Sequence, residues 1–293
     1  MYVPDVQLHE SATLQEAAEL MSRYAPNARF VAGGTDVLVD LKCGRYGIDH
    51  LISISRIDDL CGVSNSPDGL RIGALTTITE LIRSPLVREA CPAVLDAATQ
   101  MAAPQIRNVA TVGGNIACAA PCADLPPILM ALDASVSLVS PTGQRSLALE
   151  SFFRGPRKTA IGRNELLTAV HVPQSPSRSG AAYVRFGLRE GNAIAVAAVA
   201  ASLKLNDNGT IEVARIVLGS VAPTPIFSPA AADALIGQAP DRALFQSAAA
   251  LAMKAARPIS DVRGSADYRR ELIGVLTVRA LDTAHQRAEE SAP

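Results

Sequence analysis

The pattern of apolar and polar residues predicts short strands and helices mixed along the first 174 residues. A helix is expected over residues 13–24, because its apolar residues recur on one face and Thr13 with Glu16 forms a capping box at its start. Strands alternate with further helical patterns after it. The expected strands cover residues 29–31, 50–55, 70–74, 135–139 and 165–172, and the expected helices cover residues 77–82 and 92–103.

The pattern changes near residue 180. A polar segment rich in breakers, residues 174–179, is the best candidate for a linker between two domains. Three strands then precede three helices, an order typical of an α+β layer in which helices cover an antiparallel sheet. A turn at residues 206–209 joins the second strand to the third. The strands are expected over residues 181–186, 194–205 and 211–218, and the helices over residues 229–236, 242–256 and 268–285.

The bulk composition is that of a globular protein. The 293 residues are 48% hydrophobic and 19% charged, and a chain of this size can bury a core without disulfides. The net charge of −1 disfavours nucleic acid as the main partner. The basic cluster at residues 154–163 is followed by Glu165 and is interpreted as a solvated loop. No apolar run approaches the ~20 residues of a membrane span, and no signal-peptide pattern opens the chain, so a cytoplasmic location is expected.

The cysteines and histidines form no catalytic or metal-binding motif. Five cysteines, an odd number without a CxxC pair, disfavour a disulfide framework and a zinc ribbon. Cys118 and Cys122 are the only near pair, and ordinary thiols in a reducing compartment are the expected state. The four histidines are scattered, and no GxSxG motif occurs. Any redox chemistry would therefore belong to a bound cofactor.

Two glycine pairs are the most informative local motifs. Residues 31–36 read Val-Ala-Gly-Gly-Thr-Asp, and residues 111–115 read Thr-Val-Gly-Gly-Asn. A strand that ends in Gly-Gly and turns into a helix exposes backbone N–H groups that can hold phosphate oxygens. Thr35, Thr111 and Asn115 add side-chain hydrogen-bonding groups. Neither loop matches GxGxxG or the P-loop pattern, and a lone Gly-Gly most often marks a turn without a ligand. Together the loops favour a diphosphate ligand but do not identify it.

Asp124 lies just before Leu125-Pro126-Pro127, where a further helix is expected to begin. One role for this residue is the N-cap of that helix. Another is to accept a hydrogen bond from a ribityl or ribose hydroxyl group of a bound cofactor. The two roles are compatible, and both stay open.

Taken together, these segments resemble the flavin loops of the FAD subunits of the xanthine dehydrogenase family. The resemblance is carried by residues 32–36 (Ala-Gly-Gly-Thr-Asp), 111–117 (Thr-Val-Gly-Gly-Asn-Ile-Ala) and 120–126 (Ala-Pro-Cys-Ala-Asp-Leu-Pro). Within that family, the chain is similar in size and layout to the medium subunits of carbon monoxide dehydrogenase and bacterial N-heterocycle hydroxylases. Coverage is nearly end to end, since residues 267–272 (Asp-Tyr-Arg-Arg-Glu-Leu) are typical of the family's last helix.

The resemblance implies an α+β fold with a vanillyl-alcohol-oxidase-type FAD-binding domain over residues 1–174. That domain would contain two α+β subdomains, at about residues 1–56 and 57–174. A small α+β domain with a three-stranded antiparallel sheet and helices would follow over residues 181–293.

The resemblance also implies positions that contact FAD. Residues 32–36 would hold the diphosphate, Tyr183 would lie against the isoalloxazine ring, and Arg189 would lie nearby. The implied cofactor-binding residues are Ala32, Gly33, Gly34, Thr35, Asp36, Thr111, Gly114, Asn115, Cys118, Asp124, Tyr183 and Arg189.

Two features bear on which member of the family this is. Asn192 stands where relatives usually have an aspartate, and a neutral side chain there would shift the reduction potential of a nearby flavin. Cys118 and Cys122 lie within the flavin loop, but residues 121–132 lack the four-cysteine insertion that binds a 4Fe-4S cluster in 4-hydroxybenzoyl-CoA reductases. No iron–sulfur cluster is therefore expected on this chain.

The implied function is that of an electron-relay subunit in a heteromeric molybdenum hydroxylase. FAD on this chain would take electrons from 2Fe-2S clusters of a small partner and pass them to an external acceptor. A large partner would carry the molybdenum cofactor and choose the substrate, and a dimer of heterotrimers is expected. Three alternatives stay open: a stand-alone FAD oxidoreductase, which the absence of an acid–base pair disfavours; a 4-hydroxybenzoyl-CoA reductase-like subunit without the insertion; and a nucleotide-binding regulatory module.

Overall fold

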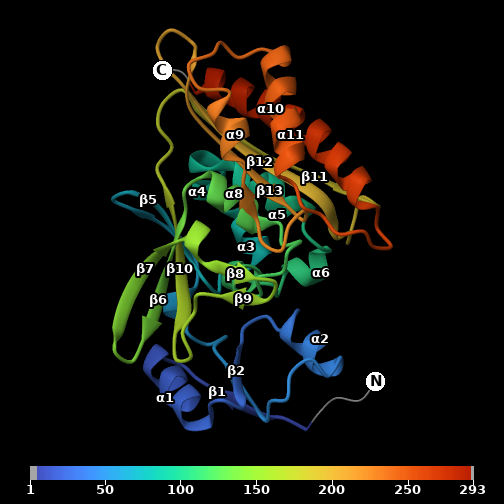
Figure 1. Cartoon of the computed structure of the whole chain (residues 1–293). Coiled ribbons are helices and arrows are strands. Elements are labelled where there is room, and N and C mark those ends of the chain that lie inside the picture. Colours follow the sequence, from blue (N-terminus) through green and yellow to red (C-terminus); the bar gives the residue numbers. More distant parts are fainter. Residues whose placement is uncertain (1–4, 292–293) are drawn as a thin grey trace.

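The computed structural model describes residues 5–291, in which helices and strands are combined throughout (Figure 1). Within that range the strands form a three-stranded, a five-stranded and a four-stranded sheet, together with one two-stranded hairpin. The N-terminal sheet lies at one end of the molecule and the C-terminal helices lie at the other. This combination confirms the expected α+β class.

The N-terminal sheet is parallel and packs against a helix. Its elements are β1 (Gln7–Glu10), α1 (Leu14–Tyr24), β2 (Ala28–Val31), α2 (Val37–Lys42) and β3 (His50–Ser53). The strand order is β1-β3-β2. α1 begins where the sequence predicts, because the Thr13 hydroxyl accepts a hydrogen bond from the Glu16 N–H. The Glu16 carboxylate, however, accepts from the Ala12 N–H, so the expected capping box is only half formed.

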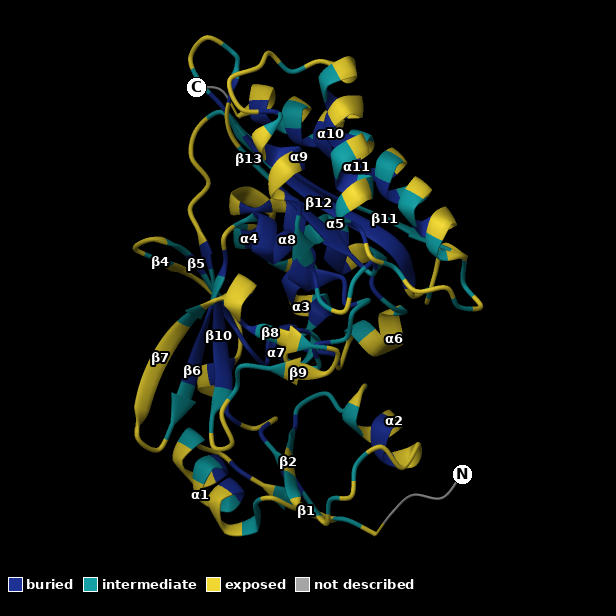
Figure 2. Ribbon diagram, viewed as in Figure 1, coloured by how far each residue is buried: buried dark blue, intermediate teal, exposed yellow. Residues whose placement is uncertain are grey.

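The middle of the chain forms the five-stranded antiparallel sheet and most of the short helices. The elements are β4 (Val63–Ser66), β5 (Gly69–Gly73), α3 (Ile78–Arg83), α4 (Pro85–Ala90), α5 (Pro92–Gln100), α6 (Pro104–Arg107), α7 (Val112–Ala117), α8 (Leu125–Ala131), β6 (Ser135–Ser140), β7 (Gly143–Ala148), β8 (Phe153–Gly155), β9 (Lys158–Thr159) and β10 (Leu166–Pro173), with short 3-10 turns at Asp58–Leu60 and Leu149–Ser151. β10 is the central strand and pairs with β5 and β6. It is mostly buried, whereas the edge strand β7 is exposed (Figure 2). A complete capping box starts α3, where Thr77 and Glu80 exchange hydrogen bonds.

The C-terminal sheet has four antiparallel strands, one more than the pattern predicts. Its elements are β11 (Ser179–Gly187), β12 (Ala195–Leu205), β13 (Ile211–Gly219), β14 (Ile226–Phe227), α9 (Pro229–Asp233), α10 (Arg242–Ala255) and α11 (Ala266–Glu290). The strand order is β11-β12-β13-β14. β14 has only two residues, both paired with β13, and a segment this short shows no alternation from which it could be predicted.

Helices cover both faces of the C-terminal sheet. α11 packs on β11 and β12 from one side, and α5 and α8 pack on the sheet from the other. Successive residues of β12 point to opposite faces: Ala198 and Ala200 join the core shared with the middle of the chain, whereas Ala197, Val199 and Ala201 join the core under α11. Burial on both faces explains why this strand reads as an almost continuous apolar run.

No helix among residues 5–291 combines the length and apolar character needed to cross a membrane.

Candidate functional site

The first glycine loop, residues 32–36, connects β2 to α2 and presents a row of open backbone donors. None of the backbone N–H groups of residues 33–37 donates to an acceptor among the described residues. Gly34 has a φ of +73°, a conformation that glycine adopts without strain. Consecutive open N–H groups at a strand-to-helix turn form a concave site for an anion. The loop therefore has the geometry expected of a phosphate cradle.

Gly33 allows this loop to contact the backbone just before the second glycine loop. A Cβ atom at position 33 would lie 1.8 Å from the Val109 carbonyl oxygen. The contact brings the two loops together even though they are far apart in sequence. Asp36 is also close enough to Cys118, which follows the second loop, for its charge to act on that thiol.

The second loop does not form the backbone cradle that the sequence predicts. Gly113 and Gly114 lie inside α7 and do not end a strand; α6 precedes them. The N–H groups of residues 112–115 are all used within the protein, donating to Thr76 O, Ala74 O, Thr111 Oγ1 and Thr111 O at 2.9, 2.8, 3.0 and 2.9 Å. Thr111 caps the helix and so satisfies donors that a ligand would otherwise need. Gly113 instead permits close packing, since a Cβ there would lie 2.7 Å from the Ala74 Cβ.

Asn115, and not Asp124, caps the start of α8 with its side chain. The Asn115 side chain, not that of Asp124, accepts from the first N–H of this helix, with Oδ1 3.4 Å from the Leu125 nitrogen. Asp124 occupies the N-cap position without a side-chain capping bond. Its Oδ1 accepts from the Tyr183 hydroxyl at 2.8 Å and from Arg185 Nη1 at 3.0 Å. Its Oδ2 has no donor among the described residues, so one carboxylate oxygen remains available.

Arg185 is a site residue that sequence reasoning missed. Its side chain is only 4% exposed, and besides Asp124 it donates to the carbonyl oxygens of Ala193, at 3.0 Å, and Gln100. The signal for it was present in the sequence. Arg185 lies two residues after Tyr183 on β11, so both side chains point to the same face of the strand.

Tyr183 lies in the core and has no open ring face. It is 2% exposed, and its hydroxyl is used by Asp124. Burial and the neighbouring Asp124 carboxylate raise the pKa of the tyrosine well above its usual value. Its hydroxyl therefore stays protonated at neutral pH and donates to the carboxylate.

Arg189 and Asn192 lie in the exposed turn between β11 and β12. Arg189 donates from Nε and Nη2 to the Asn192 carbonyl oxygen at 3.2 and 2.6 Å. Asn192 has a φ of +49°, and its N–H donates to the Ala102 carbonyl at 3.2 Å. Asn and Asp both tolerate this left-handed conformation better than most residues, so the turn itself is compatible with either side chain.

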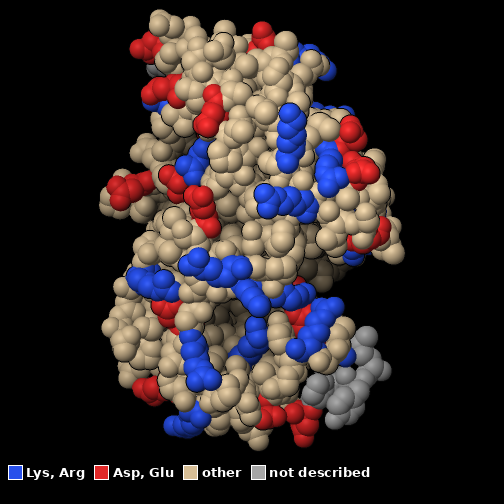
Figure 3. Space-filling model, in the orientation of Figure 1, with Lys and Arg blue, Asp and Glu red and all other residues tan. Residues whose placement is uncertain are grey.

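An ion pair of the buried Asp40 connects the N-terminal part of the site to the β8–β9 hairpin. Asp40, on α2 just after the first glycine loop, is 1% exposed and is paired with Arg157 and, at 2.6 Å, with Arg45. The Arg157 N–H donates to the Ala119 carbonyl at 2.9 Å, next to Cys118. Figure 3 shows Lys and Arg side chains gathered about a hollow between the β8–β9 hairpin and the N-terminal sheet. The basic cluster expected to be a solvated loop therefore contributes Arg157 to the site.

The thiols near the loops are free and weakly acidic. Burial raises the pKa of Cys118 to about 12, with a smaller contribution from Asp36, and burial also raises the pKa of Cys122. Among residues 5–291, no group of three or more His, Cys, Asp or Glu side chains is arranged to hold a metal ion.

Cys118 is therefore expected to resist alkylation at pH 8. Because its pKa is raised, only on the order of one thiol in 10,000 is ionised at that pH, and reactivity should appear only as the pH rises toward 12. Iodoacetamide labelling followed by peptide mass spectrometry measures this, with the exposed Cys43 as the internal reference. Labelling of Cys118 as fast as that of Cys43 would contradict this expectation.

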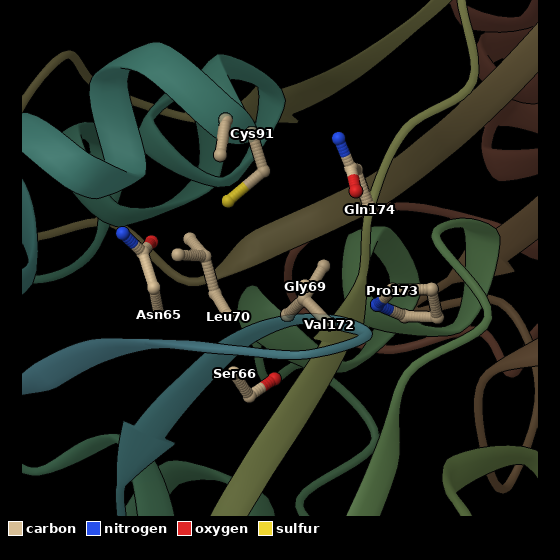
Figure 4. Close-up of a pocket in the computed structure, with 9 residues that line it drawn as sticks. Asn65, Ser66, Gly69, Leu70, Cys91, Val172, Pro173 and Gln174 are labelled. Atoms are coloured by element: carbon tan, nitrogen blue, oxygen red, sulfur yellow. The ribbon is translucent and has the colours of Figure 1, made fainter.

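One pocket lies away from these residues. It has a volume of about 280 Å³ and is lined by the end of β4, the start of β5, Cys91, the end of β10 and Gln174 (Figure 4). A larger groove of about 900 Å³ continues from it along the segment between β10 and β11. Neither contains any of the cofactor-binding residues expected from the sequence.

Known protein families match the chain in two consecutive segments. The FAD binding domain in molybdopterin dehydrogenase matches residues 4–175, which is more than half of the chain, and the CO dehydrogenase flavoprotein C-terminal domain matches residues 182–284. The chain belongs to the FAD-binding medium subunits of the xanthine dehydrogenase and carbon monoxide dehydrogenase family. FAD is accordingly the cofactor of this medium subunit, and the chain is part of an oxidoreductase.

Individual relatives are similar over nearly the whole length of this medium subunit. A putative xanthine dehydrogenase FAD-binding subunit of Escherichia coli is 34% identical over 94% of both chains. The carbon monoxide dehydrogenase medium chain of Afipia carboxidovorans is 34% identical over 96% of this chain and 97% of the relative. A chain in the structure of carbon monoxide dehydrogenase from Hydrogenophaga pseudoflava superposes with a TM-score of 0.94, at 34% identity, over 98% of this chain and 99% of the other.

Proposed function

We propose that this medium subunit relays electrons within a heteromeric molybdenum hydroxylase. It would take them from 2Fe-2S clusters of a small partner subunit and pass them to an external acceptor, while a large partner subunit carries the molybdenum cofactor. The relatives support this, since one is the medium chain of carbon monoxide dehydrogenase and another similar chain comes from the structure of a Cu,Mo-CO dehydrogenase. The observation on this chain that carries the proposal is the open row of N–H groups at residues 33–37.

The residues of the first loop would hold the diphosphate of FAD. The open N–H groups of residues 33–37 supply donors, and Thr35 belongs to the same loop and adds a hydroxyl group. Two positive charges, Arg157 and Arg45, pair with Asp40 behind the loop. They reduce the repulsion that a buried carboxylate would exert on a bound dianion.

The residues after the second loop would hold the middle of the cofactor. The open Oδ2 of Asp124 can accept from a ribityl or ribose hydroxyl, and Thr111, Gly114, Asn115 and Cys118 lie on or beside α7. The buried ring of Tyr183 would not contact the cofactor, and the residue would act through the hydrogen bond from its hydroxyl to Asp124. Arg189 and Asn192, in the exposed turn of β11 and β12, keep their proposed place near the flavin ring.

The chemistry of bound FAD is the exchange of one or two electrons, and the side chains around it bind and orient. Two of the carboxylates near the loops are committed to partners: Asp124 to Arg185, and Asp40 to Arg157 and Arg45. Asp36, in the first loop, has no ion-pair partner among the described residues, and burial raises its pKa. The Cys118 thiol stays protonated at neutral pH, because its pKa is about 12. Asp124, Asp40 and Cys118 are therefore not poised as general acids or bases for a substrate. This favours electron relay over the alternative of a stand-alone oxidoreductase.

Expression of this chain with and without its candidate partner subunits tests the proposal. The chain should carry FAD with a two-banded flavin absorbance spectrum, and it should copurify with a 2Fe-2S protein and a molybdenum-containing protein. Reduction of the complex by its substrate should bleach the flavin, whereas the isolated chain should not be bleached by the same compound. A chain that binds no FAD, or that turns over the substrate without partners, would contradict the proposal.

A further inference from the structure

The C-terminal domain contributes two side chains that fix the orientation of Asp124. We propose that Tyr183 and Arg185 are positioning residues for FAD, which hold the Asp124 carboxylate ionised and turned so that Oδ2 meets a hydroxyl of the ribityl or ribose group. This inference rests on the proposed binding of FAD at Asp124, and it adds a role for two residues of β11 that lie outside the flavin loops.

The geometry at Asp124 leaves one oxygen open. Both hydrogen bonds from β11 end on the same carboxylate oxygen, Oδ1, at 2.8 Å from Tyr183 and 3.0 Å from Arg185. Two donors from different directions fix the rotation of a carboxylate about its Cβ–Cγ bond. The other oxygen, Oδ2, is thereby aimed by the protein but not used by it.

The two donors are themselves held in place. Arg185 also donates to the carbonyl oxygens of Gln100, at the end of α5, and Ala193, so its guanidinium spans three segments of the chain. The Tyr183 ring is buried in the core, and the Tyr183 N–H donates to Asp96 at 3.2 Å. Neither side chain has to be ordered when a ligand arrives, which lowers the entropic cost of binding.

Charge gives these residues a second effect on Asp124. Burial raises the pKa of this carboxyl group, whereas the Arg185 charge and the hydrogen bonds from Tyr183 and Arg185 lower it. The other titratable group facing Asp124 is Cys122, which in turn is influenced by Asp36 and Arg263. Arg185 is thus the cation that opposes the desolvation of Asp124. Without it, the carboxylate should become protonated at a higher pH and lose its charge-assisted hydrogen bond to the cofactor.

Titration of the full-length chain with FAD, followed by quenching of flavin fluorescence from about pH 4 to about pH 9, tests the proposal. Wild-type affinity should be constant near neutral pH and fall as the pH drops through the pKa of Asp124. Asp124→Asn should bind about tenfold more weakly with no such pH dependence. Arg185→Gln should shift the acid loss of affinity upward by about one pH unit or more, and Tyr183→Phe should shift it upward by less. Arg185→Lys, which keeps the charge, should restore most of the wild-type profile.

Double variants separate positioning from a general structural effect. If Tyr183 and Arg185 act through Asp124, then Tyr183→Phe and Arg185→Gln should weaken FAD binding little further when Asp124→Asn is already present. Equal losses in both backgrounds, or unshifted pH profiles in the single variants, would overturn the proposal. If the wild-type chain binds no FAD, the proposed function is overturned. If the wild-type chain binds FAD, but no more tightly than the Asp124→Asn variant at any pH, only the present inference is overturned.

Discussion

Gly33→Ala is expected to remove FAD from the purified chain. The added Cβ would lie 1.8 Å from the Val109 carbonyl oxygen, so the first loop would have to move by about 1.5 Å to reach an ordinary contact distance. That movement would separate the two loops and redirect the open N–H groups that form the diphosphate cradle. Overpacking of this kind costs about 1–3 kcal/mol of stability, and FAD affinity should fall by at least about tenfold. The measurements are the ratio of flavin to protein after purification and the thermal unfolding midpoint.

Gly47→Ala is the matched control for this prediction. A Cβ at position 47 would meet no atom within 4 Å. The same chemical change should therefore leave the flavin content unchanged and alter stability by less than about 1 kcal/mol. If Gly33→Ala retains wild-type flavin content and affinity, the first loop does not hold the cofactor in the way proposed. If both variants lose flavin equally, the loss does not report the contact with Val109.

The first loop could be predicted from sequence because its decisive features are local. A short apolar strand, two glycines and a helix start are all read within residues 28–42, and the structure has β2, the loop and α2 in that order. The second loop has the same glycine pair, but its backbone N–H groups are used within the protein. Thr111 caps α7, and the carbonyls of Ala74 and Thr76 take two more donors. Those two partners come from a segment distant in sequence, and no pattern within residues 111–115 indicates them.

The same distinction applies to the charged residues of the site. Asp40 and Arg157 are 117 positions apart, and Asp124 and Arg185 are 61 apart, so their pairing depends on how the sheets and helices pack. A sequence shows that these residues are charged but not that Asp40 and Asp124 are buried, each against an arginine. Strand alternation does place Tyr183 and Arg185 on one face of β11, and that local rule is enough to nominate Arg185 once Tyr183 is considered. That Arg185 pairs with Asp124 could be known only from the tertiary structure.

Arg269→Ala is expected to destabilise the C-terminal domain more than any other change of a charged residue on α11. Arg269 is 4% exposed and joins this helix to three places: it donates to the carbonyls of Val196 and Ser220, at 2.9 and 3.2 Å, and to Asp261 at 2.7 Å. The alanine variant would leave buried carbonyl groups without a donor, remove a countercharge from Asp261 and open a cavity. Loss of such a set costs about 3 kcal/mol or more. Thermal and urea unfolding of the full-length chain measure this cost.

Arg270, the next residue on α11, supplies the control for this prediction. The contrast between Arg269 and Arg270 also explains the two arginines of the segment at residues 267–272. Arg270 is exposed and bonds only to the exposed Asp267, at 2.6 Å, so Arg270→Ala should change stability by less than about 1 kcal/mol. Of the two arginines in Asp-Tyr-Arg-Arg-Glu-Leu, only the first holds α11 against the ends of β12 and β13. Equal destabilisation by the two variants would show that helix propensity or net charge, and not the buried contacts of Arg269, accounts for the effect. Arg269→Lys should recover only part of the loss, because an ammonium group cannot match the planar geometry with which the guanidinium reaches both carbonyls and the carboxylate.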